Sequence, residues 1–131
     1  MKVTIYTDGA ARGNPGPAGA GAVLMQDGKI LKKCRKFLGT GTNNEAEYEA
    51  VILGLEEAKK LGATDVEFFV DSELLQRQVI GIYKVKAKNL RPLFEKIFKL
   101  KISFASFKIS HIRREKNKIA DLLANEAIDG V

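Results

Sequence analysis

The chain has 131 residues, of which 45% are hydrophobic, so its length suits a single domain (residues 1–131) built around one core. No apolar run approaches the length needed to cross a bilayer, and the N-terminus lacks the basic-then-apolar pattern of a signal peptide, so we expect no membrane association and a cytoplasmic location. Cys34 is the only cysteine, which excludes an internal disulfide, and the formal net charge of +6 favours a polyanionic partner such as nucleic acid.

The first part of the chain is predicted to form three antiparallel strands. Residues 2–7 (KVTIYT) alternate between two faces, as a half-buried strand does. Two further β-like runs cover residues 20–26 and 29–38, and the Asp27-Gly28 pair between them is typical of a hairpin turn.

The rest of the chain alternates predicted helices and strands. We expect strands at 65–71 and 103–112, and helices at 44–61, 72–82, 89–100 and 117–128. Thr42 and Asn43 are cap candidates for the first of these helices, and Asn117 is the expected cap of the last. The order βββ-α-β-α-α-β-α predicts an α/β fold, in which a mixed five-stranded sheet combines three antiparallel N-terminal strands with parallel additions and is flanked by helices.

For each of three aspartates, the sequence is consistent with either a structural role or a chemical role. Asp8 opens a Gly- and Pro-rich stretch, residues 7–19 (TDGAARGNPGPAG), so it is a turn former, a catalytic charge or part of a phosphate-binding loop. Asp71 ends a predicted strand before a helix, where it is an N-cap or a ligand. Asp121 flanks the apolar stripe of the last helix.

Glu47 is the one glutamate of the first predicted helix that does not lie on the solvent-exposed face of that helix. At 100° per residue, Glu49 and Glu56 lie within about 40° of Glu45 on an outer face, whereas Glu47 lies about 200° from Glu45. A glutamate on the inner side of a helix costs free energy unless it is paired or bound to a metal.

Taken together, Asp8, Glu47, Asp71 and Asp121 predict a divalent-metal site. Mutually close carboxylates repel one another, and divalent cations relieve that repulsion. An all-oxygen cluster suits Mg²⁺, with Mn²⁺ as a possible substitute, better than zinc. Two such ions about 4 Å apart are a standard device for in-line phosphodiester cleavage.

Four segments carry a family resemblance: TDGAARGNPGPAGAGAV (7–23), TNNEAEYEAVILGLE (42–56), VDSELL (70–75) and HIRREKNKIADLLAN (111–125). In this order, and on these predicted elements, they make the chain resemble a type 1 ribonuclease H over essentially its whole length. The resemblance implies a ribonuclease H-like fold and a Mg²⁺-dependent endonuclease that hydrolyses the RNA strand of RNA/DNA hybrids. It also implies two metal ions per site and products with 5′-phosphate and 3′-hydroxyl ends.

The resemblance assigns roles to particular residues. The metal-binding carboxylates of the family fall on the four acidic residues named above. A catalytic histidine of some members matches His111, ten residues before Asp121, with a strand side chain of no catalytic role as the alternative. Asn117 matches a family position near the site, although helix capping is a sufficient explanation for it.

Substrate contacts are implied as well. Asn14, Asn43 and Asn44 match positions that contact the hybrid in the minor groove, where 2′-hydroxyls mark the RNA strand. Thr42 matches a position that holds a phosphate of the DNA strand, with helix capping as the alternative. The best basic patch, which is otherwise a solvated loop, consists of Lys84, Lys86 and Lys88.

Two departures from the family bear on hybrid affinity. Some members carry a longer basic insertion where this chain has only YKVKAKN, and the chain has no Trp, so stacking on the DNA strand would come from Tyr or Phe.

Three other functions compete: another nuclease of the same fold, a non-catalytic hybrid-binding module, and a nucleotide-binding protein. The Asn43-Asn44 pair and the GNPG loop disfavour the first, and four intact carboxylates disfavour the second. A strand-like AGAVLM after the glycine loop, without a G-K-[ST] motif, disfavours the third. We expect a monomer whose partner is an RNA/DNA hybrid, and a start at Met1 favours a whole protein over an excised domain.

Overall fold

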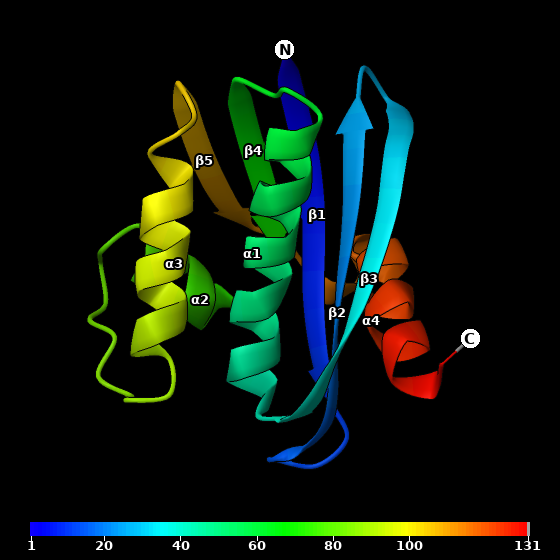
Figure 1. Cartoon of the computed structure of the whole chain (residues 1–131), viewed down its shortest axis with the longest axis vertical. Helices are drawn as coiled ribbons and strands as arrows, with labels where there is room; N and C mark the ends of the chain where they lie inside the picture. Colours follow the sequence, from blue (N-terminus) through cyan, green and yellow to red (C-terminus); the bar gives the residue numbers. More distant parts are fainter. Residues whose placement is uncertain (131) are drawn as a thin grey trace.

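A five-stranded mixed sheet runs through the molecule in the order β3-β2-β1-β4-β5 (Figure 1). The computed structural model describes residues 1–130, and Val131 lies outside the described residues. The strands are β1 (Lys2–Ala11), β2 (Gly16–Gln26), β3 (Lys29–Gly41), β4 (Asp65–Val70) and β5 (Ser106–His111). The helices are α1 (Asn43–Lys60), α2 (Glu73–Val79), α3 (Arg91–Lys101) and α4 (Lys118–Asp129), with a short 3₁₀ helix, η1 (Arg114–Lys116), before α4.

Strand directions confirm the predicted sheet. β1, β2 and β3 pair antiparallel, whereas β4 is parallel to β1 and β5 is parallel to β4. The two parallel additions are reached through helices, as parallel strands require.

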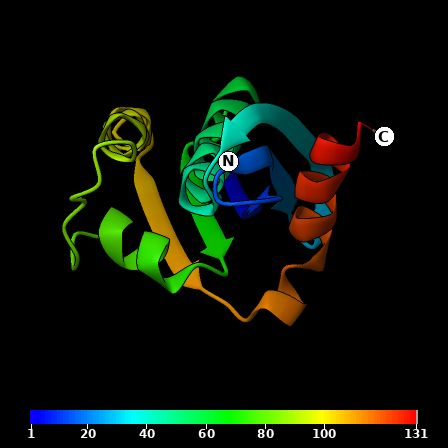
Figure 2. The same ribbon diagram turned by 90° about the horizontal axis from the view of Figure 1, so that it is seen from below.

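Helices cover both faces of the sheet (Figures 1 and 2). Side chains alternate along β1 and β2, so Ile5 and Leu24 enter the main core beneath α1, whereas Val23 faces the opposite side. There it packs in a smaller cluster with Ala120 and Leu123 of α4. The two helices that carry Glu47 and Asp121 therefore approach the central strands from opposite faces.

The N-terminal hairpin is longer than predicted. β1 continues to Ala11 instead of ending at residue 7, and β2 begins at Gly16 instead of residue 20. Residues Asp8 to Ala11 pair with Gly21 to Ala18 of β2. The prediction stopped early because Gly and Ala have low strand propensity, but here the neighbouring elements determine the conformation. The Gly- and Pro-rich stretch is mostly strand, and its short loop leads into β2, not into a helix N-terminus that could hold a phosphate.

Other element bounds shift by smaller amounts. β3 extends to Gly41, the helix predicted over 72–82 ends at Val79, and the strand predicted over 103–112 shortens to Ser106–His111. Gly81, with φ of 88°, follows the end of α2, a backbone conformation that disfavours helix continuation. Within residues 1–130, no helix combines the length and the apolarity needed to span a membrane.

Candidate active site

The four predicted acidic residues line one pocket of about 290 Å³. Asp8 comes from β1, Glu47 from α1, Asp71 from the residue after β4, and Asp121 from α4. One carboxylate oxygen from each of Asp8, Glu47 and Asp71 lies within 4.8 Å of the others. Positions spread over more than a hundred residues of sequence thus form a single acidic cluster.

Two of these aspartates emerge where a pair of strands separates. The parallel ladder between β1 and β4 ends at the pair Thr7 and Val70, so Asp8 and Asp71 are the next residue on each strand. Ser72 is the N-cap of α2, and its hydroxyl accepts a hydrogen bond of 3.2 Å from the N–H of Leu75. Asp71 is therefore not needed as a helix cap, which was the alternative explanation for it.

Gly9 allows Glu47 to reach Asp8. A Cβ at Gly9 would lie 2.2 Å from the carbonyl carbon of Ala46 and 2.3 Å from the backbone nitrogen of Glu47. The missing side chain lets α1 pack directly on β1, where the Gly9 N–H donates to Glu47 Oε1 at 2.7 Å and to Asp8 Oδ1 at 3.0 Å. The predicted inward orientation of Glu47 is confirmed, because only 7% of the residue is exposed.

Two further glycines admit α4 on the other face of the sheet. A Cβ at Gly19 or at Gly21 would lie 2.4 Å from the carbonyl oxygens of Ala124 and Ala120, respectively. Gly21 pairs with Asp8 across the β1–β2 ladder, so the start of α4 lies over the strand position next to Asp8. This close packing carries Asp121 into the pocket.

Burial and crowding perturb the acidic groups strongly. Burial raises the pKa of Asp8 to about 10, and the hydrogen bond with Glu47 and the negative charges of Glu47 and Asp71 add to the shift. Burial also raises the pKa of Glu47, partly offset by hydrogen bonds from Asp8 and Gly9 and by the positive charge of Arg114. Without a cation, the pair retains a proton; an all-oxygen set of this kind fits a divalent ion, which would displace it.

Arg114 is a member of the pocket that the sequence analysis missed. It comes from η1 and lines the pocket with the four carboxylates, although the residue as a whole is exposed. In the sequence it is one of several consecutive charged residues (RREK), and no periodicity separates it from its solvated neighbours.

Asn117 is the N-cap residue of α4, as predicted, but its side chain makes no capping hydrogen bond. Only 1% of it is exposed, and its Nδ2 donates to the backbone oxygen of Thr7 at 2.8 Å and to Asp71 Oδ2 at 3.0 Å. A spacing rule identifies the cap position but not the direction in which its side chain points.

The loop between β1 and β2 contacts the start of α1. Asn14 Oδ1 accepts a hydrogen bond of 3.2 Å from the backbone N–H of Asn43, which itself lines the acidic pocket. Asn44 is exposed in the first turn of α1. Thr42 caps α1 in a complete capping box, because its hydroxyl accepts from the Glu45 N–H at 3.1 Å while Glu45 accepts from the Thr42 N–H at 2.7 Å. The capping explanation for Thr42 is therefore confirmed.

Comparison with known proteins identifies the family. A family model described as reverse transcriptase-like matches residues 6–127. Ribonuclease HI of Halobacterium salinarum is 42% identical over 129 residues, and the crystal structure of RNase H1 from that organism superposes with a TM-score of 0.97 at 41% identity, covering 100% of both chains. Ribonuclease H of Chromohalobacter salexigens is 36% identical over 145 residues, which cover 99% of this chain and 86% of that protein. The chain belongs to the type 1 ribonuclease H family.

A third ribonuclease H, LC11-RNase H1, was solved in complex with an RNA/DNA hybrid and superposes with a TM-score of 0.93 at 46% identity, over 98% of this chain and 97% of that one.

The chain covers different shares of the length of its relatives. The chain spans 65% of the length of the Halobacterium protein and 36% of mycobacterial relatives that include a bifunctional protein of Mycobacterium tuberculosis.

The remaining residues suggested by the ribonuclease H resemblance lie outside the acidic pocket. His111 ends β5 opposite Val70, is exposed, and has its Nδ1 3.9 Å from Glu73 Oε2. The three predicted lysines are all exposed in the connection between α2 and α3. Lys84 and Lys86 line a different groove, of about 630 Å³, together with Tyr83, Arg91 and Phe94.

Proposed function

We propose that this chain is a metal-dependent endonuclease that hydrolyses the RNA strand of RNA/DNA hybrids. The observation that carries the proposal is the convergence of Asp8, Glu47, Asp71 and Asp121, from four separate elements, in one pocket. The hybrid bound to LC11-RNase H1 supports the choice of substrate, because that protein shares this fold at 46% identity.

The four carboxylates would hold two Mg²⁺ ions, with Mn²⁺ as a substitute. Bound ions of this kind would supply an activated water and stabilise charge on the departing 3′ oxygen, and cleavage of this type would leave 5′-phosphate and 3′-hydroxyl ends. The chain contributes a preformed cluster of negative charge, since close packing at Gly9 and Gly21 holds Glu47 and Asp121 beside Asp8.

The hybrid would cross the mouth of this pocket. Asn14, Asn43 and Asn44 lie at the β1–β2 loop and the adjoining start of α1, where their amides can reach base edges and 2′-hydroxyls in the minor groove. Thr42 would meet a DNA-strand phosphate beside them. The groove beside the α2–α3 connection offers positive charge for phosphates and aromatic rings for stacking, through Lys84, Lys86, Tyr83 and Phe94. Lys88 adds a further positive charge on the same connection.

His111 completes the proposal. It is the last residue of β5, one strand away from Asp71 and at the same end of the sheet as the acidic cluster, and would assist the nucleophile or product release from there. A cytoplasmic location and a monomeric state are the remaining parts of the proposal.

A substrate panel tests the proposed function. End-labelled RNA/DNA hybrid, double-stranded RNA, duplex DNA and single strands would be incubated with the chain and Mg²⁺, and cleavage of the RNA strand of the hybrid alone is expected. Glu47→Gln should abolish that cleavage, whereas the matched change Glu49→Gln, two residues away on α1, should leave it intact. Cleavage of all substrates alike, or near-normal activity of Glu47→Gln, would refute the proposal.

A further inference from the structure

Asn117 uses both of its amide hydrogens at the point where two strands part. The β1–β4 ladder ends at Thr7 and Val70, and the Asn117 amide donates to the backbone oxygen of Thr7 and to the side chain of Asp71. The amide thus bridges the last paired residue of β1 and the residue that follows β4. It connects the backbone beside one acidic residue, Asp8, to the side chain of another.

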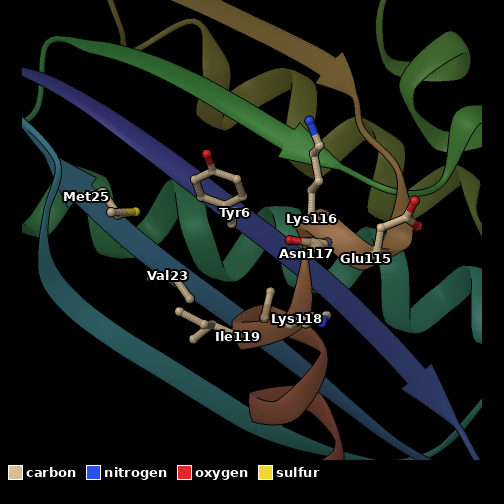
Figure 3. Close-up of a pocket in the computed structure, with 9 residues that line it drawn as sticks. Tyr6, Val23, Met25, Glu115, Lys116, Asn117, Lys118 and Ile119 are labelled. Carbon is tan, nitrogen blue, oxygen red and sulfur yellow. The ribbon is translucent and has the colours of Figure 1, made fainter.

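Asn117 is almost completely buried between the carboxylates and a pocket on its other side. Figure 3 shows its side chain lying over β1 among the residues that line a second pocket, of about 210 Å³, with mainly apolar walls that include Tyr6, Val23 and Met25. None of the four acidic residues lines that pocket. Asn117 therefore forms part of the wall between an apolar surface and the acidic site.

An asparagine at this position lowers the stability of the fold, and capping of α4 does not require it. Its Oδ1 is buried and has no hydrogen-bond partner among the described residues, and a buried acceptor without a partner costs free energy. Rotating the amide by 180° would not help, because Oδ1 would then face two acceptors, the Thr7 oxygen and the Asp71 carboxylate. An ordinary cap such as serine would satisfy α4 without this cost.

We propose that Asn117 is a positioning residue for the metal-binding site, which fixes the orientation of the Asp71 carboxyl group relative to Asp8 before a cation binds. Hydrogen-bond partners of metal-binding groups act in this way by restricting the rotation of the ligand. The inference rests on the proposed metal-dependent function.

Magnesium titration of the full chain tests the proposal. Asn117→Asp keeps the size of the side chain but replaces both donors with acceptors, and Asn117→Ala removes the side chain. Both variants should bind Mg²⁺ roughly 10-fold more weakly or worse by calorimetry. In cleavage assays, kcat at a fixed Mg²⁺ concentration should fall, while KM for the hybrid stays within about twofold, because Asn117 lies behind the carboxylates.

A matched control separates positioning from general stability. Gln78→Met removes another buried amide, whose Oε1 accepts from the Tyr48 hydroxyl at 2.5 Å, outside the acidic pocket. It should lower the Tm while retaining the wild-type Mg²⁺ affinity. Asn117 variants that lose stability but bind Mg²⁺ like the wild type would overturn the positioning role.

Two further outcomes are distinguishable. A wild-type chain that binds no Mg²⁺ would contradict the proposed function itself. If the Asn117 variants do not fold, NMR of the wild type decides the matter, because the Asn117 side-chain amide signals should shift during a Mg²⁺ titration with the midpoint found by calorimetry. Signals that do not move would refute the inference.

Discussion

The backbone N–H of Gly9 donates a hydrogen bond of 2.7 Å to Oε1 of Glu47, a residue 38 positions later in the chain. The bond is possible because strand and helix touch backbone to backbone at this point. It places the Glu47 carboxyl group beside that of Asp8, which accepts from the same N–H. One glycine therefore determines the distance between two proposed metal ligands.

Replacing this glycine tests that relationship. Gly9→Ala would place a Cβ 2.2 Å from the carbonyl carbon of Ala46, so α1 must move away from β1. We expect a loss of about 3 kcal/mol in the free energy of unfolding, measured by urea denaturation, and weaker Mg²⁺ binding. Gly41→Ala is the control, since its Cβ would meet nothing closer than 3.6 Å and should change stability by less than about 1 kcal/mol. Equal stability of the two variants would contradict the steric argument.

Stability of the metal-free chain should depend on pH through Asp8 and Glu47. Burial raises the pKa of both in the folded state, that of Asp8 to about 10 from 3.8, so each group binds a proton more tightly when folded. Their contribution to stability is therefore fully present below about pH 4 and is lost as the pH rises toward 10. In EDTA, the wild type should become less stable between about pH 5 and pH 9.

Asp8→Asn should remove most of this dependence and stabilise the metal-free chain by about 1–3 kcal/mol at pH 8, while Mg²⁺ should no longer stabilise it. Thermal denaturation across this pH range measures both effects. Asp27→Asn, in the exposed β2–β3 turn, serves as the control and should follow the wild-type profile. An Asp8→Asn profile parallel to the wild type would contradict the assigned pKa shift.

Arg114 should promote cleavage without promoting metal binding. Its positive charge competes with a cation for the acidic pocket but can also attract a substrate phosphate. Arg114→Gln should therefore bind Mg²⁺ as tightly as the wild type or a few-fold more tightly, yet cleave the hybrid roughly tenfold more slowly. Arg113→Gln, an exposed neighbour that does not line the pocket, should change neither quantity. A parallel loss of both would show that Arg114 supports the fold of the site instead.

His111→Ala distinguishes a catalytic residue from a strand residue. Because β5 pairs with β4 through its backbone, the substitution should leave the circular dichroism spectrum and the Tm nearly unchanged. Loss of a general acid–base group should reduce the single-turnover rate by about 100-fold. Lys108→Ala, also exposed on β5, should retain the wild-type rate. If neither the single-turnover rate nor the steady-state rate of His111→Ala differs from the wild type, His111 is a strand side chain only.

The lysines of the α2–α3 connection should act by neutralising phosphates of the bound hybrid. A triple variant with alanine at Lys84, Lys86 and Lys88 should have a higher KM for the hybrid. The slope of the logarithm of its binding constant against the logarithm of the salt concentration should be shallower by about one unit for each phosphate that is no longer neutralised. The value of kcat should not change, because none of the three lines the acidic pocket. The same number of charges removed from β3, at Lys29, Lys33 and Lys36, provides the control. Equal effects of the two triple variants would indicate net charge alone.

Residues whose role follows from local periodicity were predictable. Glu47 lay on the inner side of its own helix. Alternation over residues 2–7 and 65–71 placed Asp8 and Asp71 at the ends of two strands, which is where the β1–β4 ladder ends, although β1 itself continues to Ala11. Arg114 and Asn117 were not predictable in the same way. Arg114 resembles its charged neighbours in the sequence, and Asn117 resembles an ordinary helix cap. The residues next to each in the sequence do not show which distant segment packs against it.

Sequence alone determined the order of the elements, the α/β class and the four acidic residues of the candidate site, because side-chain period and turn residues act over short stretches of chain. Only the tertiary structure decided that Gly9 and Gly21 are contact points for two helices on opposite faces of the sheet, that Ser72 frees Asp71 from capping, and that Asn117 points inward. These features depend on which backbone segments approach within a few ångströms, and such approaches join residues too far apart in sequence for any local pattern to record.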